Sequence, residues 1–133
     1  TFYANTVNRY NGGSVRSVRS SPELRNVIVA FSGNGGGIYA DQLPLPIVEC
    51  SDFCGNEPAD YIGDLPDQTG ANGNISDDPL FCDAPAGNLF IDGASPCAPD
   101  NNSCGVLMGM LGVGCGASAV REASWGTIKA MFR

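Results

Sequence analysis

Six cysteines and a complete lack of histidine decide which chemistry this 133-residue chain can carry. Without histidine it can form neither a Ser-His-Asp triad nor a Cys-His pair. Zinc sites usually combine paired cysteines, often with histidine, and here only Cys50 and Cys54 lie close together. We therefore expect disulfides, which form in an oxidising, extracellular compartment. The candidates are Cys50, Cys54, Cys82, Cys97, Cys104 and Cys115. Spacing does not fix the connectivity, although we favour local bridges among the last four.

The acidic residues are the next chemical candidates. Glycosidases need two facing carboxylates, and fourteen acids permit this, but scattered surface acids give the same composition. Carboxylate oxygens are also hard ligands for Ca²⁺, although no EF-hand spacing is present. Asp77 and Asp78 precede Pro79 and are equally suited to a turn. The weak metal candidates are Asp60, Asp64, Asp67, Asp77 and Asp78, and we expect no cofactor other than this calcium.

Two triplets match the acceptor pattern for N-linked glycans. They begin at Asn74 and Asn101, and we expect both to lie in surface loops. Such triplets also arise by chance, so the pattern alone does not establish modification.

Landmarks in the first half recur at about 24 residues, which indicates a repeat of supersecondary size. Gly12-Gly13-Ser14-Val15 returns as Gly36-Gly37-Ile38-Tyr39, and Pro22-Glu23-Leu24 returns as Pro46-Ile47-Val48. So many glycines disfavour a helical repeat, whereas the run around Val27-Ile28-Val29 favours strands. Each repeat therefore predicts one coil of a solenoid, with a β-sandwich of coincidental spacing as the alternative.

Stacked coils should align recurring residues into ladders. Phe2, Phe31 and Phe53 are expected to form one inside the solenoid. Asn5, Asn34 and Asn56 are expected at a corner, because asparagine tolerates left-handed backbone and its amide can satisfy turns. Residues 57–72 are polar and glycine-containing and predict a protruding loop. From Pro79 the chain is expected to return to the stack, with strands at Leu80-Phe81, Leu89–Ile91 and within 105–113.

Several segments resemble secreted bacterial right-handed β-helix repeat proteins of pectate-lyase-like architecture. Residues 27–39 look like one of their coils, 72–83 like the entry to the last coil, and Gly93–Cys97 with Cys104–Gly109 like the closing coil. The resemblance implies an all-β fold: a short right-handed parallel β-helix of about three coils, with a disulfide-braced closing coil and a short C-terminal tail. We expect the coils within 1–116 and a linker with a docking tail in 117–133. It also implies a bacterial, extracellular or cell-surface location, and more coils upstream.

The resemblance also raises polysaccharide chemistry. Lyases of this fold pair an acidic calcium site with a Lys or Arg base. The only lysine, Lys129, lies in the tail, and Arg16, Arg19 and Arg25 lie on a presumed side of the solenoid without an acidic partner nearby in sequence. A polysaccharide-binding or lyase-like module therefore remains the alternative, and we expect the chain not to be an enzyme.

The charge distribution bears on partners. A net charge of −7 argues against nucleic acid, and no run is long enough to span a membrane. Residues 1–25 carry Arg9, Arg16, Arg19 and Arg25 against Glu23, while the remainder is strongly acidic. This is either solvated surface or a basic end that attracts the acidic end of another copy. Thr1 is not methionine, so we expect a processed or truncated start.

The tail contains apolar residues that cannot be stable alone. Trp125, Ile128 and Phe132 would share one face of a helix beginning at Ser124, or would pair as an edge strand. An open coil edge at the start of the chain would template further pairing. We thus expect an extracellular structural protein that self-associates, even into a filament; an inert cap of a longer protein is a further alternative. The self-association candidates are Phe2, Tyr3, Trp125, Ile128, Met131 and Phe132.

Overall fold

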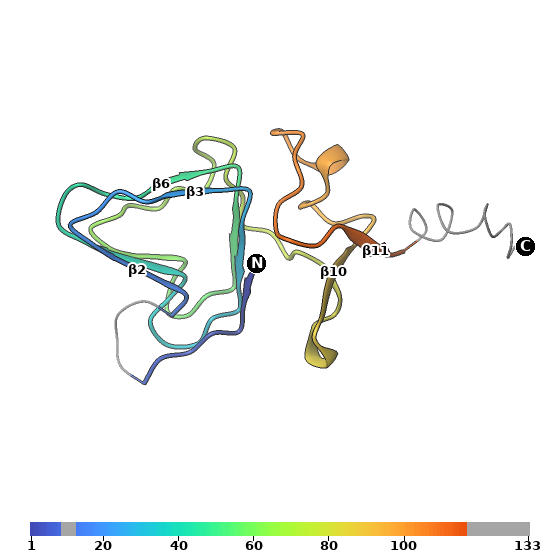
Figure 1. Cartoon of the computed structure of the whole chain (residues 1–133), viewed down its shortest axis with the longest axis horizontal. Helices are drawn as coiled ribbons and strands as arrows, with labels where there is room; N and C mark the ends of the chain where they lie inside the picture. Colours follow the sequence, from blue (N-terminus) through green and yellow to red (C-terminus); the bar gives the residue numbers. More distant parts are fainter. Residues whose placement is uncertain (9–12, 117–133) are drawn as a thin grey trace, which may run out of the picture.

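The computed structural model describes residues 1–8 and 13–116, and in them the chain forms a parallel β-solenoid (Figure 1). Three rows of strands run along the stack, each row taking one strand from successive coils. The first row is β1 (Phe2–Tyr3), β4 (Ile28–Ala30) and β7 (Asp52–Cys54). The second is β2 (Val15–Val18), β5 (Ile38–Asp41) and β8 (Tyr61–Gly63). The third is β3 (Glu23–Arg25) and β6 (Ile47–Glu49).

The strand register confirms the repeat that the sequence predicts. Leu24 pairs with Val48 in the third row, and Val29 pairs with Phe53 in the first. In the second row Val15 pairs with Ile38 rather than with Tyr39, so this part of the coil is one residue shorter than expected. Parallel pairing between coils excludes the β-sandwich alternative, whose sheets are antiparallel.

The interior of the solenoid is a single apolar cluster. It contains Val29, Ile38, Val48, Phe53 and Leu65, and Phe53 is fully buried with its ring stacked 4.8 Å from that of Tyr61. Side chains that alternate along each strand supply this interior from all three rows.

The expected phenylalanine ladder is wrong at its middle position. Phe2 and Phe53 both pair with Val29, so the interior ladder is Phe-Val-Phe. Phe31 lies beyond the end of β4, has a φ of 59° and is 39% exposed. The spacing misled because the first coil is longer than the second at this row: Phe2 and Val29 are further apart in sequence than Val29 and Phe53.

The corner asparagines are also only partly as expected. Thr6 pairs with Gly33, which places Asn5 beside Ser32 rather than beside Asn34. Asn56 is the next member, because its Oδ1 accepts the Ser32 backbone N–H at 2.9 Å and its Nδ2 donates to the Val29 carbonyl. The corner row therefore mixes serine with asparagine, and its buried amide satisfies turn backbone as the sequence argument required.

Residues 57–72 are not a protruding loop. They contain β8, which pairs with β5 and completes the third coil, and Leu65, which is 4% exposed within the interior cluster. The polar residues of this segment face outward, so its polarity reflects one surface and not a departure from the stack.

Residues 79–116 form a separate unit, here called the closing lobe. It contains β9 (Phe81–Asp83), β10 (Asn88–Asp92), β11 (Val113–Cys115) and two short 3₁₀ helices, η1 (Ala84–Ala86) and η2 (Pro99–Asn101). β10 pairs antiparallel with β9 and parallel with β11. The strands expected at Leu80-Phe81 and Leu89–Ile91 are confirmed as β9 and β10, whereas the last strand begins only at Val113.

The closing lobe packs against the side of the stack and does not continue it. Ile28 and Ala30, which point out of the solenoid, share a second apolar cluster with Ile91, Cys97 and Met108 of the lobe. Figure 1 shows the lobe beside the first row, with β10 and β11 outside the outline of the coils. The first row is therefore a wall between two apolar clusters.

Candidate functional site

One disulfide joins the closing lobe to the solenoid, and a second lies within the lobe. Cys50 is bonded to Cys104, and Cys82 to Cys115. Only the second fits the expected pairing among the last four cysteines. Gly73 lies against the first bridge with a φ of 75°, and a Cβ at this position would collide with the Cys104 sulfur. Of the six candidates, Cys54 and Cys97 are free thiols.

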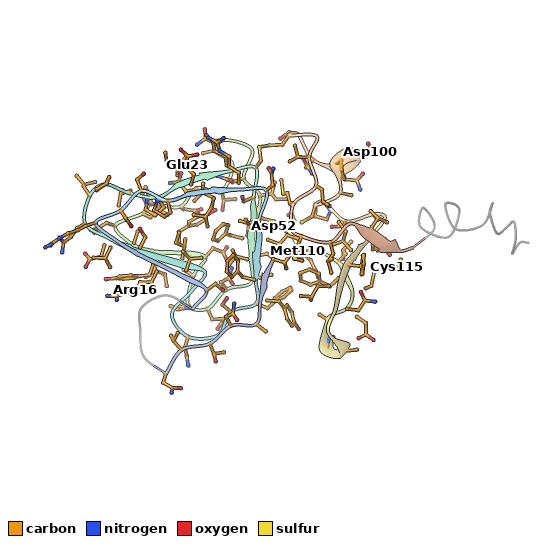
Figure 2. All side chains as sticks on the ribbon, viewed as in Figure 1. Arg16, Glu23, Asp52, Asp100, Met110 and Cys115 are labelled. Carbon is orange, nitrogen blue, oxygen red and sulfur yellow. A yellow bond between two sulfur atoms is a disulfide. The ribbon has the colours of Figure 1, made fainter. Side chains whose placement is uncertain are left out.

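Asp52 and Cys97 form a buried polar pair where the lobe meets the solenoid. Figure 2 labels Asp52, which lies on the first row between the coils and the lobe. Both residues are 0% exposed, and the Cys97 Sγ donates to Asp52 Oδ2 at 3.1 Å. The other carboxylate oxygen, Oδ1, accepts the Asp77 backbone N–H at 3.1 Å. Burial raises the pKa of Asp52 from its ordinary value of 3.8 to about 7, although both hydrogen bonds oppose the shift. Burial also raises the pKa of the Cys97 thiol, so Cys97 is a poor nucleophile.

A raised pKa in the folded state means that folding favours protonated Asp52. Its contribution to stability is therefore complete below about pH 4 and is lost as the pH rises through about 7. The slope reaches at most about 1.4 kcal/mol per pH unit. The charged groups facing it are the carboxylates of Asp77 and Asp60, which act in the same direction.

We predict that Asp52→Asn removes this pH dependence. Asparagine has nearly the same shape and is neutral at every pH, so the variant should match the parent protein near pH 3.5 and exceed its stability by a few kcal/mol near pH 8. Urea unfolding at both pH values measures the difference, and the other acids act as an internal control because both proteins contain them. Parallel stability profiles for the two proteins would contradict the assignment.

The five acids proposed for calcium are dispersed into local roles. Asp64 accepts the Gln42 backbone N–H, Asp67 that of Thr69, and Asp78 that of Leu80. Asp60 binds the Asn56 amide and the Ser76 hydroxyl. Among residues 1–8 and 13–116, no three acidic or cysteine side chains gather in a way that could hold a metal ion. Asp60 and Asp67 do line one hollow of about 430 Å³ beside Tyr61.

The arginines proposed as lyase bases have other partners. Arg16 lies over the Tyr39 ring at 5.8 Å, Arg19 donates to the Gln42 side chain, and Arg25 bridges Glu23 and Glu49. None of these contacts includes one of the five candidate acids. The three arginines therefore do not form the pairing of a base with an acidic calcium site that a lyase of this kind requires.

The two glycan acceptors lie in different surroundings. Asn74 is 2% exposed, because its Oδ1 accepts the Ser51 N–H and its Nδ2 donates to the Val48 carbonyl. The surface loop expected for Asn74 is therefore wrong. Asn101 is exposed, and its Nδ2 donates to the carbonyls of Gly93 and Ser95.

The first coil presents one unpartnered face among the described residues. β1, β2 and β3 each pair on one side only, with β4, β5 and β6. Phe2, Val15 and Leu24 are partly buried and pack on the interior cluster from this side. Tyr3 points the other way, out of the solenoid, and its ring contacts Phe31 and Phe81 edge-to-face. Trp125, Ile128, Met131 and Phe132, with the whole tail, lie outside the described residues.

Sequence reasoning missed the Asp52–Cys97 pair. The only signal was an acidic residue in the β-prone Ser51-Asp52-Phe53-Cys54 stretch, at a position that aligns with Ile28 one coil earlier. A carboxylate in an apolar repeat position marks a buried polar contact, but its partner, Cys97, is too far along the chain to be recognised from spacing.

No helix among the described residues is long and apolar enough to cross a bilayer. No protein-family model matches the chain, and no curated protein and no solved structure matches it either.

Proposed function

We propose that this chain is an extracellular structural protein that self-associates by stacking its first coil on the first coil of a second copy. The observation that carries the proposal is the face formed by β1, β2 and β3, whose strands are hydrogen-bonded on one side only among the described residues. Unpaired strand edges are the usual templates for pairing between chains.

The backbone of β2 shows which groups would form the contact. Val15 and Arg19 donate their N–H groups to the second coil. In a parallel ladder, alternate residues bond to the same neighbour, so the peptide groups of Arg16 and Val18 are directed away from β5. Their N–H and C=O groups are the ones that a second copy would pair.

The side chains on the same face favour burial. Phe2, Val15 and Leu24 extend the interior cluster to this end of the stack, and covering apolar surface stabilises association by about 25 cal/mol per Å². A second copy placed here would complete the apolar interior and the strand pairing in one contact.

The opposite end of the stack is occupied beneath β7 and in the interior, whereas, among the described residues, β6 and β8 pair on one side only there too. Asn74 satisfies the backbone of Val48 and Ser51, Ile75 exchanges backbone hydrogen bonds with Ser51 and Phe53, and Leu65 fills the interior. Two unlike ends favour a closed pair through the same face on both copies, whereas a filament needs two complementary open faces. We therefore propose a two-fold pair in place of the filament.

The compartment belongs to the same proposal. Two disulfides persist in an oxidising environment, which supports an extracellular location.

The test is the mass of the full chain in solution, measured by size-exclusion chromatography with light scattering across a concentration series. We predict a dimer, and at least a tenfold weaker dimer for Val18→Pro, because proline removes an outward N–H and leaves the bonds to β5 intact. Val18→Ala is the matched control, since it shortens the same 40% exposed side chain but keeps the N–H. A monomer at every concentration, or equal weakening by both substitutions, would contradict the proposal.

A further inference from the structure

A hollow of about 360 Å³ lies between the closing lobe and the outer surface of the first row of strands. Its apolar lining comes from both units: Tyr3 and Phe31 from the solenoid, Leu80 and Phe81 from the start of the lobe. Asp78 and Asp83 lie at its rim and are exposed.

The apolar side chains of the hollow are unusually open to solvent. Phe31 and Leu80 are each 39% exposed, and both have left-handed backbone, with φ of 59° and 56°. Bulky residues rarely adopt this conformation, which costs on the order of 1 kcal/mol or more at each position. Tyr3 holds the floor of the hollow by edge-to-face contacts with Phe31 at 6.1 Å and Phe81 at 5.6 Å. The lining is thus a fixed aromatic surface, suited to a large apolar side chain.

The disulfide between Cys82 and Cys115 brings the end of the described chain to this hollow. Cys82 is part of the lining, and its Cα lies 6.0 Å from that of Cys115. The chain passes beyond the described residues directly after Gly116. An extended segment covers at most about 35 Å between Cys115 and Trp125, which is ample to reach the hollow beside its own attachment point.

The composition of the remaining segment complements the hollow. Residues 117–133 contain Trp125, Ile128, Met131 and Phe132, which offer large apolar side chains. The same segment holds Arg121, Lys129 and Arg133 against a single acid, Glu122, so it is basic, whereas residues 26–116 contain no basic residue. The carboxylates of Asp78 and Asp83 at the rim provide the opposite charge.

We propose that residues 117–133 dock in this hollow of the same chain, with an aromatic side chain against Tyr3, Phe31, Leu80 and Phe81 and basic side chains at Asp78 and Asp83. Attachment through Cys115 makes the contact intramolecular, with an effective concentration on the order of millimolar.

Trp125 is the only tryptophan, so its fluorescence reports on the segment in the full chain. We expect a blue-shifted emission and quenching by acrylamide at least about threefold weaker than for a solvent-exposed indole, both independent of protein concentration. Leu80→Glu places a charge in the hollow and should abolish the shielding. Leu43→Glu is the matched control, because Leu43 is 77% exposed and lies outside the hollow, and it should leave the shielding unchanged.

A second variant keeps the test independent of folding defects. Asp83→Lys changes an exposed rim residue without touching the apolar lining, and it should weaken shielding most strongly at low salt. Solvent-like emission in the parent protein, or shielding that survives Leu80→Glu, would overturn the proposal. Shielding that grows with protein concentration would assign the hollow to the tail of a second copy and would also overturn it. Because the readout is fluorescence, it is separate from the mass measurement that tests self-association.

Discussion

Phe53→Ala is expected to lower the free energy of unfolding by about 3–5 kcal/mol, the cost of truncating a fully buried aromatic residue. Within residues 1–8 and 13–116, Phe53 is the largest side chain without solvent exposure, and it packs on Tyr61 and on the Val29 position of the preceding coil. The hole would lie in the interior of the solenoid, where the pairing of β7 with β4 and its bridge to Ile75 restrict collapse of the surrounding backbone.

Urea unfolding of the full chain, followed by circular dichroism, measures this loss. Phe90→Ala is the matched control, because it removes the same side chain from a position that is 41% exposed in the closing lobe. We expect the control to lose about 1 kcal/mol or less. Equal losses for the two variants would show that Phe53 does not hold the interior as described.

Removing the bridge between Cys50 and Cys104 should have an effect of similar size. The bridge closes a separation of 54 residues, and the chain-entropy relation gives about 4 kcal/mol for a loop of this length. It is also the disulfide that joins the solenoid to the closing lobe, so its loss should release the lobe at lower denaturant concentration than the coils.

The double variant Cys50→Ser/Cys104→Ser tests this without leaving an unpaired thiol at either position. Cys54→Ser is the control, because Cys54 is a free cysteine and its replacement breaks no bridge. For the double variant we expect two unfolding steps. Hydrogen exchange at increasing denaturant should show amides of the closing lobe losing protection before those of the coils. A single transition at the parent midpoint would contradict a stabilising role for the bridge.

The coils were predictable because each repeat contains its own evidence. Apolar residues at matching positions, such as Leu24 and Val48, must stack when strands pair in parallel, and their spacing is visible in the sequence. The repeat failed as a guide at Phe31, where the coil lengths differ, and at residues 57–72, where polar outer positions concealed β8.

The closing lobe was less predictable because its position depends on contacts that no repeat encodes. Cys104 meets Cys50, and Cys97 meets Asp52, only after the chain has turned back along the outside of the first row. Nothing in the spacing of these residues distinguishes a lobe on the flank from a coil on the end. The candidate face at β1, β2 and β3 was anticipated as an open edge, whereas the aromatic hollow required the packing of Phe81 on Tyr3.

The wall between the two apolar clusters has a consequence for how the coils find their alignment. Ile28, Val29 and Ala30 of β4 are all apolar and all buried, so a slip by one residue would exchange one hydrophobic face for another. In most sheets one face is apolar and the other polar, so a slip by one residue would expose the apolar side chains. Both faces of β4 are apolar and buried, so this penalty is absent here. Two polar contacts flank the strand instead: the Val27 N–H donates to Ser51 Oγ, and the Ser32 N–H donates to Asn56 Oδ1. These two hydrogen bonds can form together in only one register, so they fix the alignment of β4 against β7.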